Sequence, residues 1–246
     1  MNWILLRGLS RESAHWGNFV EYFTEAMGQD NVYCVDLPGT GLRLHEASPH
    51  SVAEIAESVI EQIGGLQGPK GLVALSLGGM VAIDIMQKQS LPDLSRVVLM
   101  NTSTAFSPFW QRMRPDNYPR LMKVAVARGL RDRERAILQM TSNKMGSSIA
   151  VLQDWVEIQE ERGISRINTL RQLWAAARYR PEQQTPTVPC LLLSSKGDRM
   201  VSYRCSETLA KRWGASIQIH PSAGHDLPLD DPAWVISQIQ TWCQSS

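Results

Sequence analysis

Length, composition and charge exclude several classes of protein. A chain of 246 residues can hold one large α/β domain, or a core domain with one insertion, and its apolar fraction of 43% is ordinary for a globular protein. The formal net charge of +1 gives no overall field that would favour nucleic acid or a membrane surface as the main partner, so we expect neither.

Short apolar runs alternate with longer amphipathic stretches along most of the chain. We predict strands at residues 3–6, 32–35, 71–75, 96–100, 190–194 and 216–220. These runs are mostly continuous in apolar character, which is typical of strands covered on both faces. Helical spacing predicts helices at about 17–27, 51–64, 77–89, 202–213 and 231–243. Strand and helix in repeated order predict an α/β fold, with a mostly parallel sheet and helices on both faces.

This alternation stops between residues 104 and 187, where helical patterns follow one another without a convincing strand. Prolines and glycines separate these patterns, and the strand pattern resumes after Pro181, Pro186 and Pro189. Because it resumes, we interpret residues 104–187 as a helical cap inserted into a core formed by residues 1–103 and 188–246. An independent second domain is the alternative.

A serine follows the third predicted strand directly and opens a predicted helix. The residues around it read Val-Ala-Leu-Ser-Leu-Gly-Gly-Met, with the serine at position 76. A sharp strand-to-helix turn needs small residues two before and two after the serine, and Ala74 and Gly78 meet that need. The turn would lift the hydroxyl of Ser76 above the sheet. The N–H of Leu77 would then lie at a helix N-terminus, where a developing negative charge is stabilised.

This pattern resembles the nucleophile elbow of the α/β-hydrolase family, although that family usually has glycine where this chain has Ala74. The resemblance covers the chain from its first strand to its last helix, except for the inserted cap. Proteins of the family usually begin with a β-hairpin before the strand that carries the oxyanion loop. Here that strand begins almost at Met1, so we expect a sheet of about six strands that lacks the hairpin.

The family order of catalytic residues is serine, then acid, then histidine, on loops after the later strands. Asp198 follows the predicted strand 190–194, and His225 follows the predicted strand 216–220. The resemblance therefore implies that His225 takes the proton from Ser76 and that Asp198 orients and stabilises the imidazole. Asp226 is a competing acid beside His225, but adjacent side chains diverge.

The second oxyanion donor is expected in the loop after the first strand, Leu-Arg-Gly-Leu-Ser at 6–10. The family commonly has His-Gly there, and the residue after the glycine donates its N–H. By that match Leu9 is the donor beside Leu77. Arg7 replaces the usual histidine, and it either pins neighbouring loops or binds an anionic group of the substrate. We favour the structural role.

The cap would determine which substrate is bound, and we predict that Trp110 and Met113 contact the substrate. His15 lies near the expected rim of the site, where a surface or helix-start role competes with a substrate contact. Between residues 106 and 182 the chain has fourteen Lys and Arg against eight Asp and Glu. The excess is either a solvated helical face or a docking surface for an acidic carrier protein. It comes mainly from Arg112, Arg114, Arg120, Lys123, Arg128, Arg131, Arg133 and Arg135.

The four cysteines are far apart and show no Cys-x-x-Cys spacing, so we expect neither disulfides nor a zinc site. No window approaches the ~20 apolar residues of a membrane span. The N-terminus also lacks the basic region of a signal peptide, and we expect a cytoplasmic protein.

These features predict a serine hydrolase that cleaves a carboxylic ester, or a thioester, through an acyl-serine intermediate. The chemistry needs no metal and no organic cofactor. The same site serves other reactions within the family, so a C–C bond hydrolase and a cofactor-free lyase remain alternatives. A hydrolase-fold receptor that binds a small molecule with little turnover is the alternative from another class.

Overall fold

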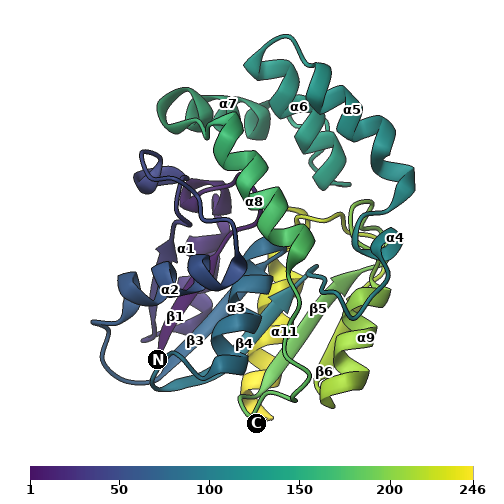
Figure 1. Cartoon of the computed structure of the whole chain (residues 1–246). Coiled ribbons are helices and arrows are strands. Elements are labelled where there is room, and N and C mark those ends of the chain that lie inside the picture. The colour runs from purple at the N-terminus through teal and green to yellow at the C-terminus, as the bar shows by residue number, and fades with distance from the viewer. Residues whose placement is uncertain (246) are drawn as a thin grey trace.

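A single parallel sheet of six strands organises the molecule, as the computed structural model of residues 1–245 shows (Figure 1). The strand order is β2-β1-β3-β4-β5-β6, and every neighbouring pair is parallel. The strands are β1 (Asn2–Leu6), β2 (Asn31–Val35), β3 (Lys70–Leu75), β4 (Leu94–Met100), β5 (Cys190–Ser195) and β6 (Ser216–His220). All six predicted strands are therefore present, most of them one or two residues longer than predicted.

Burial differs between the middle and the edges of the sheet. Every residue of β1, β3 and β5 is buried, as the apolar runs predicted. The expectation of cover on both faces is wrong for β2 and β6, in which exposed residues alternate with half-buried ones. Both are edge strands, so no neighbouring strand or complete helix layer covers their outer side.

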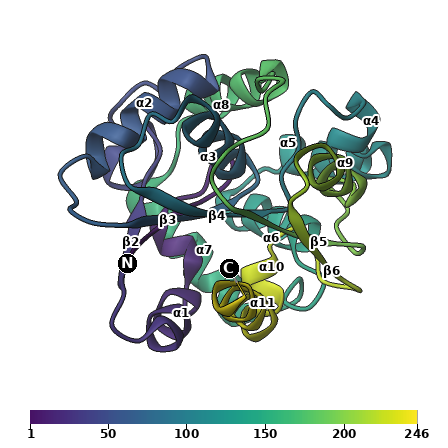
Figure 2. The same cartoon turned by 90° about the horizontal axis from the view of Figure 1, so that it is seen from below.

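Helices cover both faces of the sheet (Figure 2). On one face α2 (Val52–Ile63), α3 (Leu77–Lys88) and α9 (Arg204–Trp213) pack in one buried apolar cluster with strand residues. On the other face α1 (Phe19–Met27) and α11 (Pro232–Gln244) pack in a second cluster. Each large apolar side chain removed from water contributes about 1.5–3 kcal/mol, so these two layers hold the sheet in place.

Three short helical elements precede or follow these helices: η1 (Ser13–Trp16), η2 (Gly41–Arg43) and α10 (Leu227–Asp230). The predicted helix 17–27 begins later than expected, at Phe19. Gly17 has a positive φ of 52°, which ends η1 and separates it from α1.

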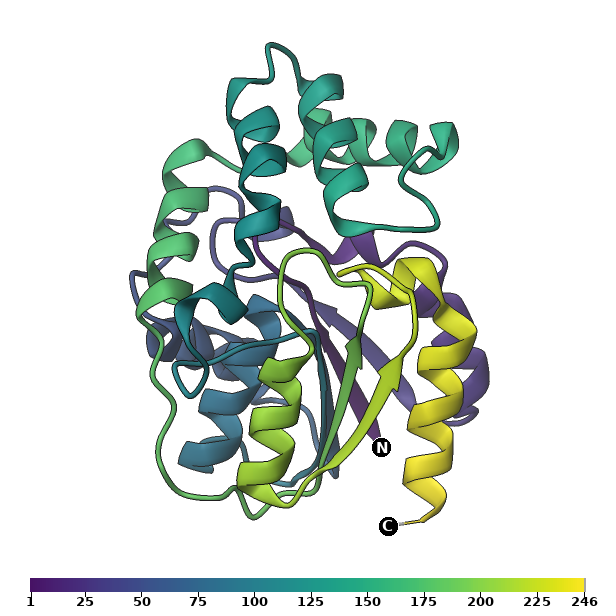
Figure 3. The same cartoon turned by 90° about the vertical axis from the view of Figure 1, so that its right-hand side faces the viewer.

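Between β4 and β5 the described chain contains helices and no strand. We call residues 104–187 the helical segment. Most of it lies beyond the carboxyl ends of the strands, and its last part descends along one face of the sheet to the start of β5, as Figures 1 and 3 show. Its elements are α4 (Phe109–Arg112), η3 (Pro115–Asn117), α5 (Tyr118–Val126), α6 (Leu130–Thr141), α7 (Ile149–Arg162) and α8 (Arg166–Arg178). Serine side chains cap α7 and α8, where Ser148 accepts from Val151 N and Ser165 from Asn168 N.

The strand order reverses at β1, which lies between β2 and β3. The loops after β1 and β3 therefore leave the sheet side by side, and such a switch point is where ligands bind in open α/β sheets. Ser76 directly follows β3. Within residues 1–245, no helix has both the length and the apolar character needed to cross a bilayer.

Candidate active site

Ser76 lies in a sharp turn between β3 and α3, with a positive φ of 56°. Non-glycine residues rarely adopt such a backbone, and it persists only where the surroundings enforce it. Here Ser76 N donates to Met100 O at 2.9 Å, and Thr102 Oγ1 donates to Ser76 O at 2.7 Å. The strained turn is thus held by the neighbouring strand β4.

Small residues let this turn approach β1 closely. A Cβ on Gly78 would lie 2.5 Å from Leu6 O and 2.6 Å from Arg7 O, so no side chain fits there. A Cβ on Gly8 would lie 3.1 Å from Ser76 Cβ. The loop after β1 therefore packs directly against the serine.

Asp198 and His225, which come from the loops after β5 and β6, form a buried pair. His225 Nδ1 lies 2.7 Å from Asp198 Oδ2. The other carboxylate oxygen of Asp198 accepts from Met200 N at 2.7 Å and Val201 N at 3.0 Å, which fixes the carboxylate plane. Burial disfavours the charged ring, but the charge and hydrogen bond of Asp198 outweigh it and raise the pKa of His225 above its ordinary value of 6.5.

No hydrogen bond joins Ser76 Oγ to His225 in the part of the chain that the structure describes. Hydrogen bonds of this kind are commonly long without substrate and tighten when it binds. The two loops are nevertheless linked, because Arg7 precedes Gly8 beside Ser76 and bonds to Asp226 beside His225. Ser76 itself is half-buried.

The N–H groups of Leu9 and Leu77 both lack a hydrogen-bond partner among residues 1–245. Leu77 is the first residue of α3, so its N–H is one of the free donors of a helix N-terminus. Leu9 follows Gly8, which packs against Ser76. Two free donors from these flanking loops can serve an oxyanion next to the serine hydroxyl.

Arg7 is buried, and its contacts favour the role of pinning neighbouring loops over that of binding an anionic group of the substrate. Its guanidinium donates to both carboxylate oxygens of Asp226, at 3.1 Å and 2.6 Å. It also lies 4.8 Å from the ring centre of Trp16. Asp226 N also donates to Thr141 O in the helical segment at 2.9 Å. The arginine thus ties the loop after β1 to the histidine loop.

His15 is buried in η1, so of the surface and helix-start roles expected for it the structure shows the helix-start one. Its ring lies 5.7 Å from that of Trp155 on α7, and Nδ1 accepts from Glu12 N at 3.2 Å. Nε2 lies 2.9 Å from Arg11 Nη1. Burial, followed by the nearby charges of Arg11 and Arg7, lowers the pKa of His15 well below 6.5, so the ring is neutral. Through its edge-to-face contact with Trp155, His15 supports the packing of η1 against the helical segment.

Trp110 and Met113 lie on and just after α4. Trp110 is 64% exposed and lines a surface pocket of about 300 Å³ with Arg114 and Tyr203, and none of the three predicted catalytic residues lines that pocket. Met113 is half-buried. Their contact with substrate stays a prediction.

Many of the basic residues of the helical segment have partners within the chain. Arg112 donates to Ala176 O and Arg114 to Asp198 O, both at 2.8 Å. Arg135 pairs with Asp132 at 3.0 Å. Much of the basic excess therefore holds the helices and the Asp198 loop in place, which favours a structural reading over carrier docking.

Asn101 is a residue that the sequence analysis missed. It follows β4, has a positive φ of 44°, and its Nδ2 donates to His225 O at 2.8 Å and to Gly224 O at 3.2 Å. Its Oδ1 accepts from Ser195 N at 3.0 Å. An asparagine directly after a buried strand was the available signal, since asparagine tolerates positive φ.

Comparison with known proteins supports the fold. The model of the alpha/beta hydrolase family matches residues 3–238. Among solved structures, an esterase from Rhodococcus sp. ECU1013 has a TM-score of 0.76 at 16% identity, covering 100% of this chain and 90% of that one. The enol-lactonase from Burkholderia xenovorans LB400 has a TM-score of 0.78 at 17% identity, covering 99% and 91%.

A thermophilic esterase from Thermogutta terrifontis has a TM-score of 0.73 at 18% identity, with 100% of this chain and 90% of that one covered. At such identities the likeness shows the fold alone. The comparison with curated proteins finds no match. Because the family model spans the chain from its first strand into its last helix, the protein belongs to the alpha/beta hydrolase family.

Proposed function

We propose that this protein is a serine hydrolase that cleaves a carboxylic ester through an acyl-Ser76 intermediate. The observation that carries the proposal is the buried pair of Asp198 and His225, 2.7 Å apart, beyond the same sheet edge as the strained turn of Ser76. A serine in a strained turn and a histidine oriented by a carboxylate are the groups that together activate a hydroxyl nucleophile.

The reaction would proceed in two halves. Ser76 Oγ attacks the ester carbonyl carbon while its proton passes to His225 Nε2, and the carbonyl oxygen becomes an oxyanion that accepts from the N–H groups of Leu9 and Leu77. The intermediate collapses, the C–O bond to the alcohol breaks, and His225 returns the proton to the leaving oxygen. Water then attacks the acyl-serine by the same route, which releases the acid and restores Ser76.

Asp198 has two tasks in this scheme. Its hydrogen bond to Nδ1 of His225 keeps that nitrogen protonated and leaves Nε2 free to accept from Ser76. Its negative charge then stabilises the imidazolium that forms. The same stabilisation of the charged ring by Asp198 raises the pKa of His225.

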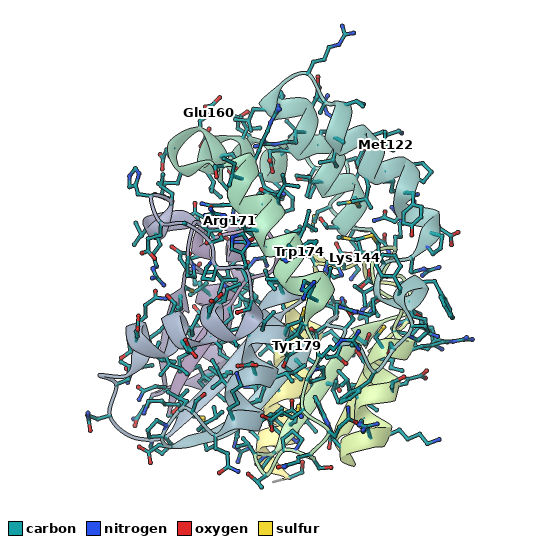
Figure 4. All side chains as sticks on the ribbon, viewed as in Figure 1. Met122, Lys144, Glu160, Arg171, Trp174 and Tyr179 are labelled. Carbon is teal, nitrogen blue, oxygen red and sulfur yellow. The ribbon has the colours of Figure 1, made fainter. Side chains whose placement is uncertain are left out.

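We further propose that the helical segment acts as a cap that contributes the pocket for an apolar acyl group. Among the described residues, eleven of the fourteen exposed large apolar side chains belong to this segment. They include Met122 on α5 and Trp174 on α8, which Figure 4 labels, with exposed fractions of 59% and 55%. So much exposed apolar surface in one segment marks a binding region.

The names of similar structures, which include esterases and a lactonase, support ester chemistry over the alternatives of C–C cleavage, a lyase reaction or a receptor. Fluorophosphonate labelling and turnover of p-nitrophenyl esters, with wild type and Ser76→Ala, test it. We expect wild type to label and turn over, and Ser76→Ala to lose at least ~10³-fold in kcat and all labelling. A wild type that neither labels nor turns over would overturn the proposal.

A further inference from the structure

The loop after β1 is closed by a tight turn whose shape is unusual. Arg11 N donates to Gly8 O at 3.3 Å, so Leu9 and Ser10 are the two central residues of a four-residue turn. Ser10 has a positive φ of 57°, a conformation that is unfavourable for a non-glycine residue. A relaxed turn of the same four residues would have a negative φ at Ser10 and a flipped peptide between Leu9 and Ser10.

A buried glutamine of the helical segment holds that peptide. Ser10 N donates to Oε1 of Gln172 on α8 at 2.9 Å, and Ser10 Oγ donates to Thr169 Oγ1 at 3.1 Å. Gln172 is 0% exposed, so its amide oxygen has no water to replace the serine N–H. The bond favours the strained form of the turn over the relaxed one.

The core in turn holds the amide of Gln172. Gln172 Nε2 donates to Ser48 Oγ at 3.4 Å, and Ser48 Oγ donates to Pro38 O at 2.6 Å. Because Ser48 Oγ already donates to Pro38 O, it needs a donor from Gln172, and the NH₂ end of the amide faces Ser48. The oxygen end therefore faces Ser10. The orientation of the turn thus depends on the side chain of Gln172, whose amide is aligned by a hydroxyl that Pro38 O orients.

We infer that Gln172 is a positioning residue that holds the Leu9 N–H in the geometry needed for the oxyanion. The inference rests on the proposed function, in which Leu9 is one of two oxyanion donors. Leu9 N–H belongs to the adjacent Gly8–Leu9 peptide, and Gly8 packs against Ser76. A flip of the Leu9–Ser10 peptide changes the chain that directly follows this donor, so the turn that fixes the donor beside the nucleophile is loosened. The helical segment would therefore shape the catalytic centre as well as the substrate pocket.

The competing explanation is that Gln172 only fastens α8 to the core. Asn168 provides a matched control, since it lies one turn earlier on the same helix and is also buried. Its side chain accepts from Ser48 N at 3.0 Å and donates to Glu46 O at 2.9 Å, and it makes no hydrogen bond with Ser10. Asn168→Ala therefore loosens the same junction without touching the turn.

The test compares Gln172→Leu, Gln172→Glu and Asn168→Ala with wild type. Complete loss of one oxyanion donor costs about 10²–10³-fold, so displacement of Leu9 N–H in Gln172→Leu should lower kcat on p-nitrophenyl acetate by roughly 10- to 100-fold at similar KM. Affinity for a trifluoromethyl ketone, which forms an oxyanion on Ser76, should fall in parallel. Gln172→Glu keeps the acceptor oxygen for Ser10 N but loses the donor to Ser48 Oγ and buries a carboxyl group, so it should recover only part of both. Asn168→Ala should keep wild-type kcat and ketone affinity.

Amide hydrogen exchange at residues 8–11 gives a readout that needs no activity, and it should rise in Gln172→Leu and not in Asn168→Ala. Wild-type kcat, ketone affinity and exchange in Gln172→Leu would overturn the inference, as would equal losses in Asn168→Ala. A wild type without turnover or ketone binding would instead overturn the proposed function, and the exchange data would still show whether Gln172 holds the turn.

Discussion

Arg7 and Asp226, 219 residues apart in the chain, form a bidentate ion pair beneath the candidate active site. Their side chains are only 3% and 4% exposed, so neither charge has water as an alternative partner. Arg7 precedes Gly8, which packs against Ser76, and Asp226 follows His225. The pair therefore joins the loop that would bind the oxyanion to the loop that carries the general base.

Removal of Arg7 should destabilise the protein strongly. Arg7→Met leaves the Asp226 carboxylate buried without its partner, and breaking a buried ion pair in this way costs about 3–5 kcal/mol of unfolding free energy. Urea unfolding would measure the loss. The double variant Arg7→Met with Asp226→Leu removes both charges and should recover much of it. A single variant as stable as wild type would show that the pair does not hold the loops.

Activity should depend on pH through His225. The neutral ring is the form that accepts the proton of Ser76, and Asp198 raises the pKa of His225 above 6.5 against the opposing effect of burial. We therefore expect kcat/KM to rise with pH through a pKa above 6.5. Unfolding free energy should change in the opposite sense. The contribution of a raised pKa is complete below pH 6.5, and it is lost as pH rises through the folded-state value.

Asp198→Asn is the matched test of that pH dependence. Asparagine keeps the oxygen that accepts from Met200 N and Val201 N, but it removes the charge and favours the wrong tautomer of His225. We expect kcat to fall by about 10⁴-fold, and the acid limb of the pH profile to move to lower pH because burial alone lowers the pKa. An unchanged pH profile in Asp198→Asn would contradict the assignment.

The strand ends that carry Ser76, Asp198 and His225 could be predicted because local patterns report them. Short and mostly continuous apolar runs predicted all six strands, and the carboxyl ends of parallel strands meet at one edge of the sheet. The small residues around Ser76 predicted the turn, and Gly78 shows the reason in its close approach to β1. Motif order then assigned the three residues to their loops.

The contacts that support the site could not be predicted in the same way. Ser10 meets Gln172 across 162 residues, and Arg7 meets Asp226 across 219. Neither pair has a periodic or local signature, since each depends on how the helical segment and the late loops fold over the sheet. The burial of His15 could not be predicted for the same reason, because it depends on Trp155.

The helical segment should govern preference for acyl chain length. Trp174→Ala removes apolar surface from α8, so kcat/KM for p-nitrophenyl decanoate should fall several-fold while that for the acetate changes little. A series of esters from acetate to decanoate measures this. Leu42→Ala is the control, because Leu42 is 83% exposed and lies outside the segment. Equal effects on acetate and decanoate would contradict a pocket for the acyl group.

Gly78 should be the most sensitive glycine near the nucleophile. In Gly78→Ala the new Cβ would lie 2.5 Å from Leu6 O, a distance that forces α3 away from β1 and tilts the Ser76 turn. We expect a loss of a few kcal/mol in unfolding free energy, in the range of other overpacked cores at about 1–3 kcal/mol, together with a large loss of fluorophosphonate labelling. Gly65→Ala is the matched control, since nothing lies within 4 Å of its new Cβ. If Gly78→Ala labelled at the wild-type rate, the close approach of β1 to the Ser76 turn would have no part in presenting the nucleophile.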